Sequence, residues 1–252
     1  MSATAMDNVR SATPGQVRRS PSVPAHWPIR RHVAAAETTP AGPLHSVEVT
    51  VPAKTNLTLH VGPAHEEWGG RHALDTIYCA IGVNDVVTAT AKTPGSGFSL
   101  ELSGEHLGDL ASSGSDMRRN HAVLALFAIA RAAGREPDVA LHVDKHIPVG
   151  AGLGGGSADA AATLLAVNTL WGLHWPIERL RDIAATLGAD MPFCLEGGYA
   201  HGTGFGERII PLEDDSSCVQ TLRDRGFAGQ LLVGAYRAQL STPNVYSTFD
   251  KL

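Results

Sequence analysis

The sequence has no apolar run that approaches the roughly 20 residues needed to span a membrane, and its start lacks the pattern of a secretory signal. Positive charge is also scarce: 20 lysines and arginines stand against 25 aspartates and glutamates, a net charge of −5. Such a protein has no general attraction for nucleic acid or anionic lipid. We therefore expect a cytoplasmic protein that binds neither nucleic acid nor membranes and holds any anion by a local device.

Cysteine is equally scarce, with only three residues, at positions 79, 194 and 218. They are far apart, form no C-x-x-C pair and have no histidine at metal-ligand spacing. This pattern argues against a disulfide framework and against a metal cage. We expect three buried free thiols.

Residues 1–45 have few large apolar side chains. They are rich in serine, alanine and proline and carry five arginines against Asp7 and Glu37. A segment of this composition cannot offset the entropy lost on ordering it, which predicts a disordered N-terminal extension. A basic, serine-containing, acid-poor stretch is also typical of an organelle transit peptide, so an organelle is the alternative location.

From residue 46 onward, short alternating strands mix with stretches of helical length, which predicts an α+β fold without internal repeats. Strands are expected at 46–51, at its partner 57–61, and at 76–82, 86–91, 98–102, 138–143, 198–200, 208–212 and 230–235. Helices are expected at 121–133, 157–171 and 177–187, and a last helix begins at Pro243.

The segment Pro148-Val-Gly-Ala-Gly-Leu-Gly-Gly-Gly-Ser157 is a glycine-rich loop before a helix. Glycine lets backbone N–H groups converge on a phosphate without a Cβ in the way, and the helix adds its positive end. Ser157 is expected to cap that helix or to give its hydroxyl to a phosphate or Mg²⁺. Asp159 has an ordinary explanation as an acid favoured at a helix start.

Two other glycine motifs fit less well. A Walker loop needs lysine before its Ser or Thr, and Gly156 stands there. Gly150, Gly152 and Gly155 match G-x-G-x-x-G, but the helix is followed by Trp171–Pro176 and another helix rather than by a strand ending in an acid. A purely structural turn remains open, although it does not need so many glycines. The loop therefore predicts phosphate binding and favours an ATP-dependent small-molecule kinase.

Three separated motifs carry a family resemblance: Pro52-Ala-Lys-Thr-Asn-Leu57, the glycine loop with the following Ala-Asp-Ala-Ala-Ala, and Gly188-Ala-Asp-Met-Pro-Phe193. In order and wording they resemble the GHMP kinase superfamily and, within it, the 4-diphosphocytidyl-2-C-methyl-D-erythritol kinases, over residues 46–252. The resemblance implies a ribosomal-protein-S5-like ATP-binding domain at 46–206. It also implies an incomplete ferredoxin-like domain at 207–252, because a third glycine-rich motif of the family is missing.

The resemblance also implies the roles of site residues. Asp190 would take the proton of the acceptor hydroxyl, and Lys54 would offset the charge on the γ-phosphate and hold Asp190 ionised. ATP would bind with Mg²⁺, whose protein ligand would be Ser157. The residues expected to bind ATP are Pro148, Gly150, Gly152, Leu153, Gly154, Gly155, Gly156, Ser157, Asn120 and Lys145. Lys145 could equally be a solvated lysine.

The acceptor pocket matches the family less evenly. Asn56 and Thr242 are expected to contact the substrate, His72 to read the cytosine edge and Tyr246 to cover one face of the base. Tyr246 has an equally good explanation as a helix residue that packs inward. Arg71 stands where the family has a stacking tyrosine, and its guanidinium could stack instead.

Three functions are therefore compared. The first is an active kinase, monomeric or dimeric, that phosphorylates the 2-hydroxyl of 4-diphosphocytidyl-2-C-methyl-D-erythritol in the non-mevalonate route to isoprenoid precursors. The second is a truncated, non-catalytic nucleotide-binding fragment. The third is a GHMP kinase for another small alcohol, which the substitution at Arg71 favours.

Overall fold

The computed structural model describes residues 31–32, 44–105, 107, 117–227, 229, 231–234 and 242–251. The strands of this part are β1 (Arg31–His32), β2 (Ser46–His65), β3 (Arg71–Ala91), β4 (Ser99–Gly104), β5 (Val139–Lys145), β6 (Tyr199–Thr203) and β7 (Arg208–Leu212). The α-helices are α1 (His121–Ala133), α2 (Gly155–Leu170), α3 (Ile177–Leu187), α4 (Met191–Glu196), α5 (Ser217–Asp224) and α6 (Thr242–Phe249). The predicted extension lies outside the described residues, apart from β1 and residues 44–45.

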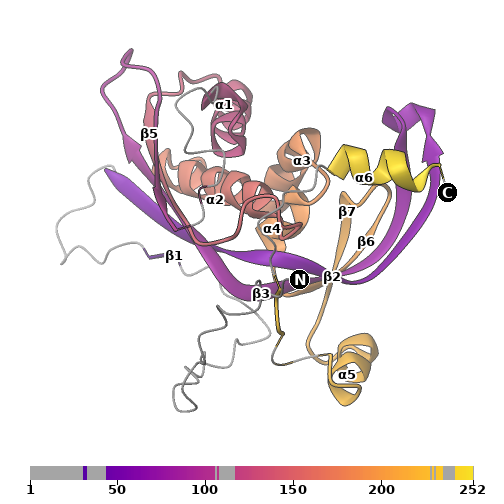
Figure 1. Cartoon of the computed structure of the whole chain (residues 1–252). Helices are drawn as coiled ribbons and strands as arrows, with labels where there is room; N and C mark the ends of the chain where they lie inside the picture. The colour runs from indigo at the N-terminus through magenta and orange to yellow at the C-terminus, as the bar shows by residue number, and fades with distance from the viewer. Residues whose placement is uncertain are drawn as a thin grey trace, which may run out of the picture.

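All the described strands belong to one sheet, in the order β1-β2-β3-β5-β4, with β6 paired to β3 and β7 paired to β6. Every pair is antiparallel except β4 with β5. The helices α1, α2, α3 and α4 lie together on one side of this sheet (Figure 1). The predicted α+β class is confirmed.

The prediction of two short strands before residue 62 was wrong. Residues 46–51 and 57–61 are parts of one strand, β2, and both pair with β3 rather than with each other. The register shifts at Pro52/Ala53 and at Asn56/Thr58 let the strand continue past a proline, which lacks the N–H for a regular ladder. The strands predicted at 76–82 and 86–91 likewise form one strand, β3.

The length of β3 places two regions of the molecule on one strand. Its second half pairs with β5 from Val86 to Ala91, and its first half pairs with β6 from Thr76 to Cys79. Because β5 leads into the glycine loop and β6 follows α4, β3 links the two parts of the chain that carry the phosphate and Asp190 motifs.

The core lies between the sheet and helices α1 and α2. Helix α2 is rich in alanine, and almost every residue from Ala158 to Leu170 is buried, so it packs closely against its neighbours on all sides. Helix α1 begins at the cap residue Asn120, whose side chain accepts a hydrogen bond from the N–H of Ala122, and it ends at Gly134 in the left-handed conformation. The predicted bounds of α1 and α3 are confirmed.

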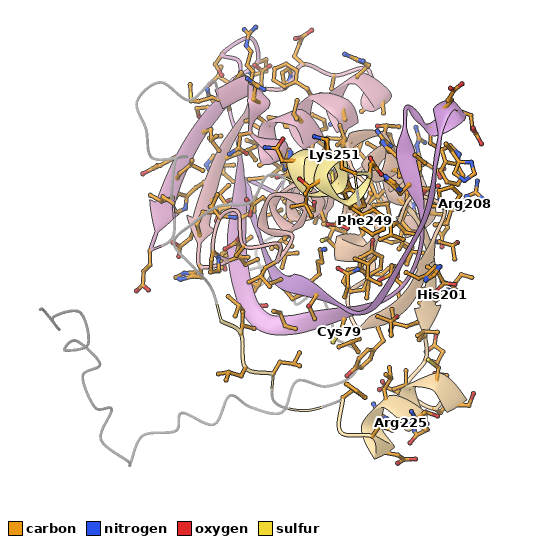
Figure 2. The ribbon with its side chains drawn as sticks, turned by 45° about the vertical axis from the view of Figure 1, so that its right-hand side comes forward. Cys79, His201, Arg208, Arg225, Phe249 and Lys251 are labelled. Carbon is orange, nitrogen blue, oxygen red and sulfur yellow. The ribbon has the colours of Figure 1, made fainter. Side chains whose placement is uncertain are left out.

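Helices α4 and α5 were not predicted. Helix α4 is only six residues long and almost entirely buried, so it shows no helical periodicity in the sequence. A strand was predicted at 230–235, but residues 231–234 are not in a strand, and the ends of that range lie outside the described residues. Helix α5 lies apart from the rest in both views (Figures 1 and 2).

The cysteines are free, and two of them, Cys79 and Cys194, are buried as predicted, whereas Cys218 is partly exposed. Burial raises the pKa of the Cys79 thiol to about 11. Among the described residues, no helix is both long enough and apolar enough to cross a membrane.

Candidate active site

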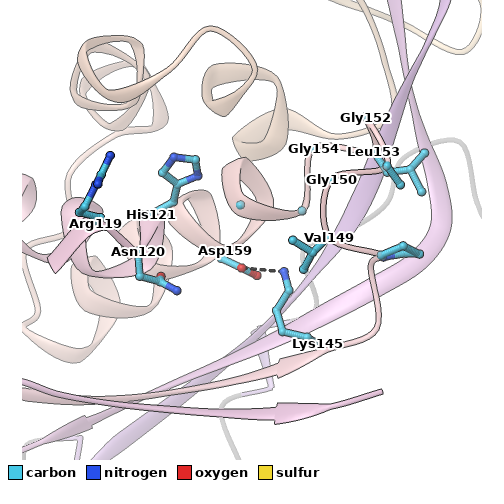
Figure 3. Close-up of a pocket in the computed structure, with 14 residues that line it drawn as sticks. Arg119, Asn120, His121, Lys145, Val149, Gly150, Gly152, Leu153, Gly154 and Asp159 are labelled. Carbon is cyan, nitrogen blue, oxygen red and sulfur yellow. Dashed lines mark hydrogen bonds and ion pairs between the residues drawn. The ribbon is translucent and has the colours of Figure 1, made fainter. Parts of the chain in front are cut away.

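A cavity of about 270 Å³ lies between the glycine loop and the start of α1 (Figure 3). Its lining residues are Arg119, Asn120, His121, Lys145, Pro148, Val149, Gly150, Ala151, Gly152, Leu153, Gly154, Gly155, Gly156 and Asp159. Every residue predicted to bind ATP except Ser157 is in this set. The structure therefore has a cavity at the position where the sequence predicts phosphate binding.

The loop needs glycine for two separate reasons. Gly154 is the N-cap of α2 with φ 70°, and a Cβ there would lie 2.7 Å from Cγ of Lys54. A Cβ on Gly156 would overlap the ring of His121. The loop therefore packs against β2 at Gly154 and against α1 at Gly156, and neither position has room for a side chain.

The start of α2 faces this cavity. Of the two roles expected for Ser157, that of helix cap was wrong, because Gly154 caps the helix and Ser157 is its third residue; its role toward phosphate or Mg²⁺ stays a prediction. The first backbone N–H groups of a helix have no acceptor within it, and together with the helix dipole they favour an anion. Arg119 adds positive charge to the same cavity.

Lys145 is not a solvated lysine, because it is buried in an ion-pair cluster (1% exposed). Its Nζ contacts Oδ2 of Asp85 and lies 2.7 Å from Oδ2 of Asp159. The second oxygen of Asp85 accepts hydrogen bonds from the N–H groups of His146 (2.6 Å) and Ile147 (2.8 Å). The cluster therefore ties β3, the approach to the glycine loop and helix α2 together.

Asp159 is buried as well, rather than an exposed acid at the helix start. Asp159 lines the cavity, and its Oδ1 is buried without a hydrogen-bond partner among the described residues. Burial raises the pKa of Asp159 to about 7, with Lys145 opposing the rise and Asp85 adding to it. The neighbouring His121 has a lowered pKa because of burial and then the charge of Lys145.

A second ion pair lies beside the loop. Nζ of Lys54 is 3.1 Å from Oδ2 of Asp190, and the two side chains are 10% and 32% exposed. Lys54 comes from β2, and Asp190 directly precedes α4. Its carboxylate does not cap that helix and is available for other contacts.

Lys54 is held from two directions. Its backbone N–H donates to the carbonyl of Leu153 in the glycine loop, at 2.9 Å. Its Nζ also donates to Oδ1 of Asn56 at 3.0 Å, and Nδ2 of Asn56 donates to Oγ1 of Thr76 at 2.7 Å. Within the described residues, two of its three N–H donors are thus engaged, which leaves one for a ligand.

The second carboxylate oxygen of Asp190, Oδ1, has a partner that the sequence did not predict. The hydroxyl of Tyr78 donates to Oδ1 of Asp190 at 3.1 Å. Four residues of the candidate site have no predicted role at the site: Tyr78, Asp85, Asp159 and His121. For Asp159 the signal was its place two residues after the loop; for Tyr78 and Asp85 no local signal marks them.

The residues predicted to bind the acceptor base lie at the other end of β3, where α6 covers them. The rings of His72 and Tyr246 stack at 5.1 Å between centroids. His72 Nε2 lies 3.0 Å from Oδ1 of Asp250, and its Nδ1 is 2.9 Å from the carbonyl of Gly62. Figure 2 shows α6, with Phe249 labelled, between the other helices and the tip of the β2–β3 hairpin.

Arg71 contacts a different aromatic ring from its neighbour His72. Its guanidinium lies over the ring of Phe205, 4.4 Å from the centroid. Phe205 in turn contacts Trp68 edge to face at 6.0 Å. Thr242 is the first residue of α6, and its side chain lies outside the described part of the structure.

Comparison with known proteins shows the family of this chain. The model of the GHMP kinase N-terminal domain matches residues 120–198. The 4-diphosphocytidyl-2-C-methyl-D-erythritol kinase of Bifidobacterium adolescentis is 74% identical over 209 residues, which are 83% of this chain and 68% of that protein. The chain belongs to the 4-diphosphocytidyl-2-C-methyl-D-erythritol kinase family.

Other members of this kinase family are more distant. The enzyme of Streptomyces avermitilis is 44% identical, over 82% of this chain and 63% of its own length. A crystal structure of a 4-(cytidine 5'-diphospho)-2C-methyl-D-erythritol kinase is 37% identical, with a TM-score of 0.52 over 66% of this chain and 55% of that chain. Homoserine kinase from Cytophaga hutchinsonii, at 19% identity and a TM-score of 0.52 over 69% of this chain and 54% of that one, shares the fold alone.

This member of the kinase family spans about two thirds of the length of the curated relatives it matches. The part it spans includes the glycine loop, Lys54 and Asp190. The predicted division at residue 206 stays a prediction. Strand β7, beyond that residue, is hydrogen-bonded to β6 in the same sheet.

Proposed function

We propose that this chain phosphorylates the 2-hydroxyl of 4-diphosphocytidyl-2-C-methyl-D-erythritol with ATP, a step of the non-mevalonate route to isoprenoid precursors. The observation that carries the proposal is the Lys54–Asp190 ion pair, which is attached to the glycine loop through the backbone of Lys54. The identity of the acceptor is inferred from the names of the relatives, and the cavity beside the ion pair has room for the phosphates of ATP.

ATP would bind with its phosphates in the cavity. The backbone N–H groups at the start of α2 and the charge of Arg119 would offset the phosphate charge. Asn120 lies in the same cavity, where its Oδ1 caps α1 and its amide nitrogen can serve the nucleotide. The cluster of Lys145 with Asp85 and Asp159 keeps the loop and α2 in place before ATP arrives.

Lys54 and Asp190 would act on the transferred group. Phosphoryl transfer depends on alignment and charge neutralisation more than on covalent help. Asp190 accepts or orients the proton of the acceptor hydroxyl, and its one-third exposure leaves room for that contact. The remaining N–H donor of Lys54 would bind the γ-phosphate and stabilise the negative charge that develops there.

The residues present fit a magnesium ion brought by ATP. Among the described residues there is no group of three or more histidine, cysteine or acidic side chains that could hold a metal by itself. Mg²⁺ would therefore take phosphate oxygens and water as its main ligands. Asp159, which lines the cavity and whose buried Oδ1 has no hydrogen-bond partner among the described residues, would hold it, with Ser157 nearby in α2. Bound there, the ion would neutralise phosphate charge.

The acceptor base would enter beside His72 and Tyr246. Because these rings are stacked on each other, a base that used both would have to separate them. Asn56, next to Lys54, and Thr242 at the start of α6 would contact the rest of the acceptor. We place the protein in the cytoplasm, as a monomer or a homodimer.

A second function follows from Arg71. Its guanidinium is engaged with Phe205, on the β6–β7 turn, so it is not poised as a substitute for a stacking tyrosine. This favours a GHMP kinase whose acceptor is another small alcohol. A non-catalytic nucleotide-binding protein is the third outcome.

The test is turnover of purified protein with ATP, Mg²⁺ and 4-diphosphocytidyl-2-C-methyl-D-erythritol, followed by ³¹P NMR of the product. Asp190→Asn should lower kcat by at least about 100-fold. Asp182→Asn, the same change on an exposed position of α3, should leave kcat unchanged. Turnover with other alcohols alone would support the second function. ATP binding without turnover of any alcohol would leave only nucleotide binding.

A further inference from the structure

Tyr78 is the largest fully buried side chain of the described part of the structure, and it lies at the candidate active site. Its ring stacks on Phe193 of α4, with 4.9 Å between centroids and 19° between planes. Gly202 of β6 and Gly206 of the β6–β7 turn make the slot for this ring, because a Cβ on either would overlap its atoms. The ring therefore has one position.

The hydroxyl at the end of this fixed ring has two acceptors within reach. Oδ1 of Asp190 is 3.1 Å away, and the carbonyl of Gly206 is 3.4 Å away. A hydroxyl has a single hydrogen to donate. The shorter contact is to a charged oxygen, and hydrogen bonds to carboxylates are the stronger ones, so the hydrogen goes to Asp190.

Asp190 is consequently held at both oxygens. Tyr78 donates to Oδ1 and Lys54 donates to Oδ2, from neighbouring strands of the sheet. Nζ of Lys54 also lies 5.7 Å from the centre of the Tyr78 ring, within reach of a cation–π contact. Tyr78 therefore touches both members of the ion pair.

We propose that Tyr78 is a positioning residue for Asp190: its hydroxyl fixes the rotation of the carboxylate, so that one lone pair faces the acceptor hydroxyl. The inference rests on the proposed function, because it assigns a purpose to the orientation of Asp190. A carboxylate held by Lys54 alone could rotate about its side-chain bonds and would spend less time aligned for proton transfer.

The electrostatics of the pocket keep Tyr78 in this role. Burial, and then the charge of Asp190, raise the pKa of Tyr78 well above its ordinary value. The hydroxyl therefore stays protonated and can only donate to the carboxylate. It does not compete with Asp190 for the proton of the acceptor.

The test is Tyr78→Phe, which removes one oxygen and keeps the ring in its slot. We expect kcat to fall about tenfold, as for the loss of one hydrogen bond to a charged group, and the KM for ATP to stay within about twofold. The acid limb of the pH–kcat profile should move to higher pH, because the carboxylate loses a donor that favours its charged form. A purely structural role would not move that limb.

Tyr199→Phe is the matched control. Tyr199 is a half-buried tyrosine of β6 whose hydroxyl interacts with Cys79 rather than with Asp190. Its loss should leave kcat and the pH profile unchanged. In an Asp190→Asn background, Tyr78→Phe should cause no further loss of kcat; a further tenfold loss would mean that the hydroxyl acts independently of Asp190 and would overturn the inference.

A readout that does not need turnover separates this inference from the proposed function. In protein with ¹³C-labelled aspartate, the Asp190 carboxyl signal is identified by its loss in Asp190→Asn. Its titration should move to higher pH in Tyr78→Phe and stay in place in Tyr199→Phe. An unchanged titration in Tyr78→Phe overturns the inference even if the parent is an active kinase. An inactive parent with a shifted titration contradicts only the proposed function.

Discussion

The phosphate end of the site, the cavity between the glycine loop and α1, differs from the acceptor end formed by Arg71, His72 and Tyr246. The phosphate end has a buried lysine held by two buried acids, and its backbone is fixed by close packing on both sides. At the acceptor end the rings lie against each other under α6, and Asp250, which pairs with His72, has a half-exposed side chain. Under the proposed function, the first end would be ready for phosphate, and the second would have to separate its rings to admit a base.

The Lys54–Asp190 pair connects the two ends. Lys54 contacts the glycine loop through its backbone and through its side-chain stem, and Asp190 lies close enough to Tyr246 for its charge to raise the pKa of that tyrosine after burial.

The largest effect should follow from Gly154→Ala. Alanine is strained at φ 70°, and its Cβ would push the stem of Lys54 away from Asp190. A shift of about 1 Å in a reacting group can cost roughly 100-fold in rate, and we expect kcat to fall by about that factor. Gly152→Ala is the matched control, since Gly152 has nearly the same φ, 74°, but open space where the Cβ would lie. Equal losses in the two variants would show that strain alone matters.

An intermediate effect confined to the phosphate end should follow from Asp159→Asn. If Asp159 holds Mg²⁺, the concentration of Mg²⁺ for half-maximal activity should rise about tenfold, as for the loss of a group that tunes a metal site. The KM for the acceptor should not change. The measurements are magnesium titration of the rate and calorimetry of Mg·ATP binding. A change in acceptor KM alone would mean that the two ends are not separate.

The smallest effects should come from the acceptor end. His72→Ala should raise the KM for the acceptor by about tenfold, the loss of a hydrogen bond to a buried polar group, with no change in the KM for ATP. Arg71→Ala should change either constant by less than about twofold, because Arg71 contacts Phe205 on the surface and exposed contacts are weak. A larger loss for Arg71→Ala than for His72→Ala would restore Arg71 as the stacking partner.

The two ends also differ in how well the sequence predicts them. The loop and the helix after it are consecutive in the chain, so the glycines and the helix pattern were enough to predict a phosphate site, and the structure has a cavity there. Helices α1 and α3, with clear caps and periodicity, were predicted to the residue. Lys54 and Asp190 are far apart in the chain, and only the family resemblance brought them together.

The contacts that were missed depend on the long strands. The register of β3 with β5 pairs Val86 with Asp144 and so brings Asp85 to Lys145, which no local pattern reveals. Strand β2 continues through Pro52, and β3 through Asn84, because the register of their pairing shifts there. In the sequence, these positions resemble the ends of strands. Tyr78 contacts Asp190 for the same reason, because its strand, β3, continues beyond its pairing with β5 and pairs there with β6.

The central claim is that Lys54 and Asp190 act as one unit in phosphoryl transfer, and a double-mutant cycle with Lys54→Met and Asp190→Asn tests it most directly. The measurement is single-turnover transfer from ATP to 4-diphosphocytidyl-2-C-methyl-D-erythritol in the parent, both single variants and the double variant. Each single change should lower the rate by about 100-fold or more, and the double variant should be no slower than the worse single one. Losses that multiply in the double variant would contradict the claim.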